Sequence, residues 1–210
     1  MQPGLLPLFP LQVVLFPGAE LPLHIFEERY KEMVGEAEAA GSEFGIVLAK
    51  DDGIVNTGCT VTVEDVLERY PDGRFDVMTR GKRRFEITSL NQEKDYLRGV
   101  VEYFDDEDFR PVTPELGRRA IAALQNMREA LSLEDSGMPD VDNPALSFQL
   151  AQTVEDLDFQ NMIQRSRSET DRLRMFAEFT EGYIARQQYA TKMKRAAPLN
   201  GSGHKPASLL

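Results

Sequence analysis

Cysteine and histidine are scarce in this 210-residue sequence, which has one cysteine, Cys59, and two histidines, of which only His24 lies outside the C-terminal tail. A single cysteine excludes an internal disulfide and a zinc site built from several cysteines. One cysteine and one histidine can hardly assemble a transition-metal site, so we expect no metal and no cofactor. Cys59 opens an alternating strand pattern, where a cysteine is usually a small buried hydrophobe, because a nucleophile would need a base beside it.

Long apolar runs are also absent. No uninterrupted hydrophobic stretch approaches the roughly 20 residues that a membrane helix needs. The apolar start does not fit a signal peptide, because no lysine or arginine precedes Arg29 and its prolines would break a helical segment. We therefore expect a cytoplasmic protein without a membrane partner.

The sequence has no phosphate-binding loop of the form Gly-x-x-x-x-Gly-Lys-Ser/Thr. Gly81 and Lys82 are followed by Arg83, and the preceding glycine of the motif is missing. Serine, aspartate and lysine are plentiful, but their spacing singles out no dyad. Adjacent carboxylates such as Glu64 and Asp65 would point to opposite faces of a strand. We expect no catalytic residue.

Charge and composition describe a globular protein that repels nucleic acid. Hydrophobic residues make up 41% of the sequence and charged residues 28%, which leaves enough apolar material for a core. The formal net charge of −11 opposes binding to phosphate backbones. Nucleic acid is therefore disfavoured as a partner, except at a local basic patch.

The stretch from Leu5 to Tyr30 interrupts short apolar runs with four prolines. Proline lacks an amide donor and fixes φ, so it fits edge strands and sharp corners. Phe16-Pro17-Gly18 predicts a turn. The chain is therefore expected to bend repeatedly around a core. The prolines are Pro7, Pro10, Pro17 and Pro22.

The spacing of the apolar residues then changes twice along the chain. Apolar residues at helical spacing predict a helix over about 26–40, ended by Gly41. Short alternating runs predict strands from Phe44 to Phe104. The turns between them are expected at 51–53, 70–73 and 80–82.

The charged segment at 105–108 lacks the calcium-loop pattern and is expected to be a solvated linker. Beyond this segment, the sequence pattern is helical. Thr113-Pro114 is a good helix start, with a hydroxyl cap and proline at the first position. Ser168 and Asp171 resemble a capping box. Further helices are expected from Asn143-Pro144, over 157–163 and after Ser168, with the pattern ending near Ala190.

The opening stretch also resembles a known family. Pro-Leu-Phe-Pro-Leu, Val-Leu-Phe-Pro-Gly and Leu-Pro-Leu-His-Ile-Phe-Glu-x-Arg-Tyr are similar to the start of the N-terminal, substrate-binding domain of the Lon proteases. Further segments agree in order: Gly58-Cys59, Asp72-Gly73-Arg74, 81–85 and Tyr96-Leu97-Arg98. The resemblance is strong in the first half of the chain and looser in the helical half. It identifies the chain as a stand-alone member of this family.

The resemblance implies an α+β fold: a small PUA-like β-barrel or pseudo-barrel with a crossing helix, followed by an α-helical bundle. We assign 1–108 to the β-rich subdomain, 109–190 to the bundle and 191–210 to a flexible tail. The chain would lack the ATPase and peptidase domains of Lon, so no catalysis is expected.

The implied function is recognition of exposed apolar segments of unfolded or client polypeptides in protein quality control, alongside a protease or chaperone. An apolar groove at the proline corner is the expected site. His24 is also expected to bond backbone groups that the neighbouring prolines leave unpaired. The residues expected to contact the peptide are Phe16, Pro17, Leu23, His24, Phe26 and Tyr30.

Two alternatives stay open. PUA-like domains include RNA binders, and one basic cluster could contact RNA, although its only interleaved aromatic, Phe85, is expected to point inward. An enzyme with an unrecognised site would need a deep pocket holding groups with perturbed pKa values. The cluster consists of Arg80, Lys82, Arg83 and Arg84.

Overall fold

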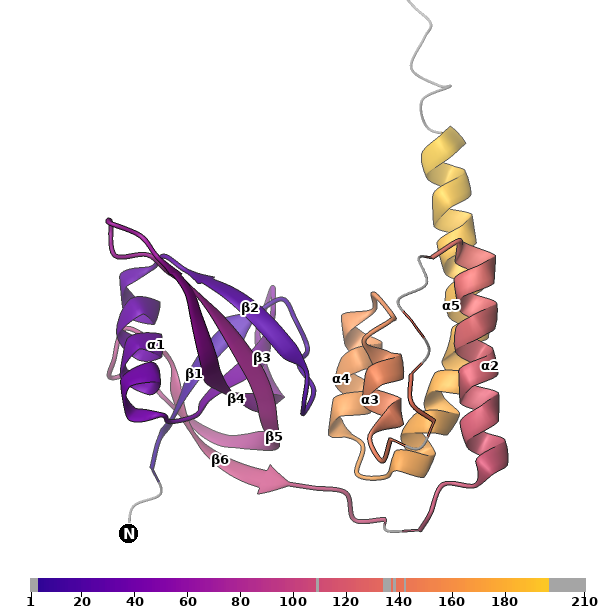
Figure 1. Cartoon of the computed structure of the whole chain (residues 1–210), viewed down its shortest axis with the longest axis horizontal. Coiled ribbons are helices and arrows are strands. Elements are labelled where there is room, and N and C mark those ends of the chain that lie inside the picture. Colours follow the sequence, from indigo (N-terminus) through magenta and orange to yellow (C-terminus); the bar gives the residue numbers. More distant parts are fainter. Residues whose placement is uncertain (1–3, 109, 134–136, 138, 142, 197–210) are drawn as a thin grey trace, which may run out of the picture.

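The computed structural model describes residues 4–108, 110–133, 137, 139–141 and 143–196, which form an α+β protein (Figure 1). All six strands and one helix lie in one half of the molecule, and four helices form the other half. The elements are β1 (Leu6–Leu11), β2 (Glu20–Ile25), α1 (Glu28–Ala40), β3 (Phe44–Lys50), β4 (Gly53–Arg69), β5 (Phe75–Asn91), β6 (Arg98–Phe104), α2 (Pro114–Leu131), α3 (Leu146–Ala151), α4 (Leu157–Arg165) and α5 (Glu169–Ala196).

The strands pair in the order β2-β5-β4-β3-β1-β6, and β5 also pairs with β6. The pairings therefore form a ring through β5, β4, β3, β1 and β6, with β2 attached to β5. Of the strand pairs in the described part of the chain, β1 with β3 is the one parallel pair. Among the described residues β2 has β5 as its one partner strand, which agrees with the prediction that proline marks an edge. β1 has two neighbours despite its prolines, but its pairing with β6 is limited to Leu6 and Pro7.

Helix α1 forms as its apolar spacing predicts. Tyr30, Met33, Val34 and Ala37 are buried on one face. Gly41 ends the helix with a φ of 60°, in the left-handed region that glycine tolerates best. The helix starts at Glu28, two residues after the predicted start.

The turn expected at Arg80-Gly81-Lys82 is wrong, because β5 runs straight through it. Instead, the Phe16–Ala19 turn packs closely against Gly81. The Gly18 amide donates to the Gly81 carbonyl at 2.9 Å, and the Gly81 amide donates to the Ala19 carbonyl at 2.8 Å. This glycine marks a close backbone approach and not a chain reversal. The turns expected at 51–53 and 70–73 are confirmed.

The helix caps in the second half form at the residues that the sequence predicts. The Thr113 side chain accepts a hydrogen bond from the Leu116 amide, ahead of Pro114. The Ser168 hydroxyl accepts from the Asp171 amide at 3.2 Å, at the start of α5. Both caps satisfy amides that a helix start leaves without partners.

Two helix boundaries differ from the prediction. α3 starts at Leu146 and not at Pro144, because the Asn143 side chain accepts from the Ala145 amide at 2.8 Å in a turn that precedes the helix. α5 continues to Ala196, so the start of the predicted tail is helical, while 197–210 lies outside the described residues.

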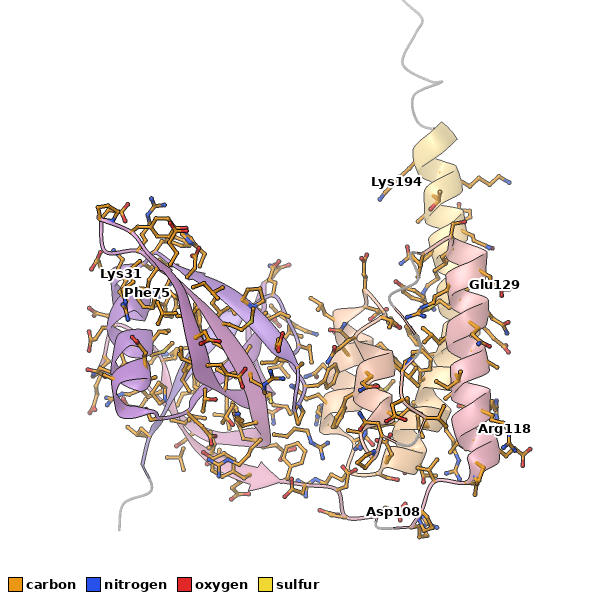
Figure 2. All side chains as sticks on the ribbon, viewed as in Figure 1. Lys31, Phe75, Asp108, Arg118, Glu129 and Lys194 are labelled. Atoms are coloured by element: carbon orange, nitrogen blue, oxygen red, sulfur yellow. The ribbon has the colours of Figure 1, made fainter. Side chains whose placement is uncertain are left out.

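The two halves share a core. One apolar cluster fills the interior between the strands and α1. A second joins the helices to Val14, Phe16 and Leu48 of the β-rich half, and Phe16 stacks on Phe148 of α3 with ring centroids 5.1 Å apart. Side chains fill much of the space between the halves, whereas Arg118 and Glu129 of α2 point to solvent on the far side (Figure 2). The proline corner therefore helps to hold the helices in place.

Among the described helices, none combines the length and apolarity that a bilayer crossing requires.

Candidate functional site

The structure separates the six residues predicted to bind a peptide. Phe16, Leu23 and Tyr30 are buried: Phe16 lies between the halves, Leu23 lies in the core of the β-rich half, and Tyr30 stacks on Phe9 with centroids 4.0 Å apart. These three side chains hold the fold together, so the six do not line one open groove.

The other three predicted residues lie at the surface. Along β2 the burial alternates, with Leu23 and Ile25 inside and His24 outside. Phe26 follows the strand and is 58% exposed, and its ring lies 5.9 Å from that of His24. Pro17 is half-buried in the turn before β2. We call the exposed group of His24 and Phe26 the β2 surface.

Among the described residues, His24 bonds none of the backbone groups that the sequence suggested. Its Nδ1 lies 2.5 Å from Oδ1 of Asp76, and the Tyr70 hydroxyl donates to the other Asp76 oxygen at 2.8 Å. The reason is the register, which pairs His24 with Asp76 across β2 and β5, so both side chains project on the outer face. A histidine, a carboxylate and a phenol therefore stand together beside Phe26.

These contacts lower the pKa of Asp76 below its usual value of 3.8, chiefly through the hydrogen bond from His24 and then through that from Tyr70. We expect the pKa of Asp76 to rise toward 3.8 in His24→Ala, as measured by carboxyl-carbon NMR titration. Because the folded pKa is depressed, the stability from this contact is present above about pH 4 and is lost as the pH falls through the folded value. An unchanged Asp76 titration in the variant would contradict this assignment, and Tyr70→Phe provides the comparison for the second hydrogen bond.

Every cation of the predicted basic cluster has a carboxylate partner. This pairing neutralises the charge that contact with RNA would need. The structure thus lends the RNA alternative no support. The pairs are Arg80 with Glu20 and Glu64 at 2.6 Å, Lys82 with Glu64 at 3.9 Å, Arg83 with Glu43 at 2.9 Å and Arg84 with Asp106 at 2.6 Å.

Arg84 belongs to a buried charge network that the sequence did not reveal. Its guanidinium and that of Arg172 share the carboxylate of Asp106, with closest distances of 2.6 Å in both cases. The Phe148 ring lies beneath both guanidiniums, 5.2 Å from Arg84 and 4.4 Å from Arg172. The network joins β5, the segment after β6, α3 and α5, so it fixes the helical half against the strands.

The predicted solvated linker at 105–108 is therefore wrong in part. Asp106 is largely covered, and Asp108 accepts a hydrogen bond from Ser168 at 3.0 Å. Burial alone would raise the pKa of Asp106, but hydrogen bonds from Arg172 and Arg84 outweigh it and lower the pKa. The acidic run contributes specific ion-pair partners and not only solvated charge.

Cys59 is fully buried, as predicted, and burial raises the pKa of its thiol to about 12. A thiol with this pKa stays protonated near neutral pH and is a poor nucleophile. Within the described ranges, no three His, Cys, Asp or Glu side chains are grouped so as to hold a metal ion.

The chain matches the family described as the ATP-dependent protease La (LON) substrate-binding domain over residues 5–188. It is 34% identical to a Lon protease of Parabacteroides distasonis over 110 residues, which are 48% of this chain and 13% of that protein. It is 30% identical to a Lon protease of Roseiflexus castenholzii over 134 residues, which are 60% of this chain and 17% of that protein. The chain thus spans less than a fifth of the length of these relatives.

Two solved structures share its fold. The Lon N-terminal domain protein from Xanthomonas campestris aligns with a TM-score of 0.66 and 28% identity over 81% of this chain and 95% of that chain. The N-terminal domain of a Lon protease from the Mycobacterium avium complex aligns with a TM-score of 0.58 and 18% identity over 85% of this chain and 98% of that chain, a likeness of fold alone.

Proposed function

Because the chain belongs to the LON substrate-binding domain family, we propose that it is a non-catalytic module that binds exposed apolar segments of unfolded or client polypeptides. The observation that carries this proposal is the family match over residues 5–188. The module would act in cytoplasmic protein quality control, delivering its polypeptides to a protease or chaperone.

We also propose that this chain supplies neither ATPase nor peptidase chemistry. The matched family is the substrate-binding part of Lon, and the one thiol in the chain is buried and protonated. Binding would need no cofactor, since burial of apolar surface supplies the free energy.

We infer that the ring of strand pairings is a small PUA-like barrel crossed by α1, with the β-rich subdomain at 1–108, the helical subdomain at 109–190 and the tail at 191–210. The closing pair between β5 and β6 supports the barrel. The two main apolar clusters support the division, although Val14 and Phe16 pack with the helices.

We assign polypeptide contact to the β2 surface, next to Pro17. β2 pairs along one edge with β5, and its other edge is without a partner strand among the described residues. An extended polypeptide can satisfy such unpaired main-chain groups, while an exposed ring gives apolar contact beside the new strand. Phe26 provides that ring, and Pro22 keeps the edge from pairing fully, which suits weak and reversible capture.

Replacement of Phe26 by serine is expected to weaken binding of apolar peptides about tenfold, because burial of an aromatic ring contributes on the order of 1.5 kcal/mol. The measurement is titration calorimetry of the whole chain with peptides selected on an array, where the unmodified protein should bind in the micromolar range.

The matched control is Leu90→Ser, since Leu90 is 48% exposed on β5 and lies among the residues that pair with β6. It should leave the affinity unchanged. A peptide array without preference for apolar sequences would overturn the proposed function. Binding of RNA that weakens steeply with salt would favour the RNA alternative instead.

A further inference from the structure

The C-terminal end of α5 extends beyond the helix on which it packs. The Gln188 side chain donates to the Ala130 carbonyl at 3.2 Å, and α2 ends at Leu131. The turns of α5 that follow Gln188 therefore continue past the end of α2, as Figure 1 shows. We call residues 189–194 the α5 overhang. Nothing in the proposed function uses this surface.

The α5 overhang combines exposed apolar and cationic side chains. Tyr189 and Met193 are 66% and 52% exposed and lie four positions apart, on one face of the helix. Lys192 and Lys194 flank Met193, are exposed and have no ion-pair partner among the described residues. No acidic residue of α5 follows Glu181. The overhang therefore fits an acidic surface that also exposes an apolar side chain.

A surface of that kind lies on the same chain, at the end of the hairpin formed by β4 and β5. The pairing of β4 with β3 stops at Val61, so the rest of β4 has β5 as its one partner strand in the described part of the chain. Leu67 is 55% exposed there, between the exposed carboxylates of Asp65 and Glu68. We call Asp65, Leu67 and Glu68 the hairpin patch.

The hairpin patch keeps a surplus of negative charge when its neighbours are counted. Asp65 and Glu68 have no ion-pair partner among the described residues, although Glu68 accepts a hydrogen bond from the Tyr70 hydroxyl at 3.1 Å. Each lysine and arginine from 62 to 82 contacts a carboxylate other than these two. The pairs are Arg69 with Glu38 at 2.7 Å, Arg74 with Asp72 at 2.7 Å, Arg80 with Glu20 and Glu64 at 2.6 Å, and Lys82 with Glu64 at 3.9 Å, and the nearby His24 contacts Asp76.

Two other occupants suit the α5 overhang less well. A second overhang would bring the lysines of both copies together, and like charges repel. The phosphate backbone of RNA would meet a chain whose formal net charge is −11, which opposes its approach. An acidic protein surface of limited size, such as the hairpin patch, avoids both costs.

We propose that the α5 overhang of one copy docks on the hairpin patch of a second copy. The two apolar residues of the overhang pack on Leu67, and its two lysines pair with the carboxylates on either side of Leu67. Phe75, at the hairpin end of β5, and Lys194 both lie in the upper half of Figure 2. A two-fold axis would let each copy give one overhang and receive the other, which closes a dimer with two equal contacts. This proposal is independent of the proposed function.

Sedimentation velocity of the whole chain over a concentration series tests the proposal. We expect a monomer–dimer equilibrium in the micromolar range, because the contacts are small. The dimer should weaken as the salt concentration rises, since salt screens exposed ion pairs. Lys192→Glu combined with Lys194→Glu should weaken it at least about tenfold, because each substitution acts at both contacts. Tyr189→Ser should weaken it about fivefold.

Reversal of both charged surfaces gives the sharpest test. Asp65→Lys combined with Glu68→Lys should weaken the dimer, and should restore it when joined to the two lysine-to-glutamate changes. The matched control makes the same charge change at two exposed arginines of α2, outside both surfaces, and should leave the dimer unchanged. These control substitutions are Arg118→Glu and Arg119→Glu.

Three results would overturn the proposal: a chain that stays monomeric, a dimer that tightens as salt is added, or a fully reversed variant that does not associate. Association that is lost with the overhang changes but is insensitive to the hairpin changes would also overturn it. In that case another acidic surface covers the overhang.

Discussion

Replacement of Arg172 by methionine is expected to lower the free energy of unfolding by about 3–5 kcal/mol, the usual cost of breaking a buried ion pair from one side. The Arg172 side chain is 1% exposed. Both terminal nitrogens contact the Asp106 carboxylate at 2.6 Å, and one also contacts Glu169 at 2.7 Å. Methionine fills similar space but leaves the carboxylates without their main cation.

The loss should also loosen the junction between the two halves. Arg172 donates to the Ser147 hydroxyl at 2.8 Å, and Glu169 accepts from the amide and the hydroxyl of that serine. Removing the guanidinium thus leaves a buried hydroxyl and a carboxylate with fewer partners, which carries a desolvation cost for each. Of the two guanidiniums that contact Asp106 in the described structure, Arg84 would remain.

Urea unfolding followed by circular dichroism measures this change. Arg174→Met is the control, because Arg174 lies two residues further along the same helix and its pair with Asp171 is exposed. An exposed pair of this kind contributes about 0–1 kcal/mol. A loss below about 1 kcal/mol for Arg172→Met would show that the network does not stabilise the junction.

The importance of Arg172 could not be predicted, because no local pattern distinguishes a buried arginine from a solvated one. The helical period places Leu173 and Phe176 on the apolar face of α5, and both are buried. Arg172 is adjacent to that face, and its local sequence does not mark it as buried. Its partner Asp106 lies 66 residues away in an acidic run, so only the tertiary fold brings the charges together.

Predictions from the sequence were more accurate for features that depend on a few neighbouring residues. Gly41 ends α1, and Thr113 and Ser168 cap their helices. Each of these depends on the conformational limits of a few consecutive residues. Such local limits determine where a helix or strand begins and ends, but not which other elements pack against it.

The candidate site shows the same limit of prediction from a single sequence. The sequence placed Phe16 and Phe26 in one peptide-binding group because both are apolar residues of the proline corner. Phe16 is instead fully buried against Phe148, 132 positions along the chain, while Phe26 stays exposed. Burial depends on which distant element packs on a residue, and a single sequence carries little information about that.

Gly81→Ala is expected to destabilise the protein by about 3 kcal/mol, at the upper end of the cost of overpacking a core. A Cβ at this position would lie 2.2 Å from the Phe16 carbonyl oxygen and 3.1 Å from its carbonyl carbon. Real Cβ atoms essentially never come within 3.0 Å of another atom, so something must shift. The clash is with backbone, and that backbone is fixed by hydrogen bonds from Gly18 to Gly81 and from Gly81 to Ala19.

Relief of the clash would move the Phe16 turn away from β5. Since Phe16 is fully buried and stacks on Phe148, this movement would disturb the packing of the helical half as well as that of the strands. Gly81→Ala should therefore lower stability in both halves at once. Tryptophan is absent from the sequence, so the two halves are best followed separately by amide hydrogen exchange, alongside urea unfolding.

Gly35→Ala makes the same chemical change, but we expect it to have the opposite effect on stability. Gly35 lies inside α1, and a Cβ there meets nothing within 4 Å. Alanine should stabilise the helix by up to about 1 kcal/mol, because glycine is the poorer helix former. If Gly81→Ala were as harmless as Gly35→Ala, the close approach of the Phe16 turn to β5 would be wrong, and with it the reason that a glycine occupies the middle of a long strand.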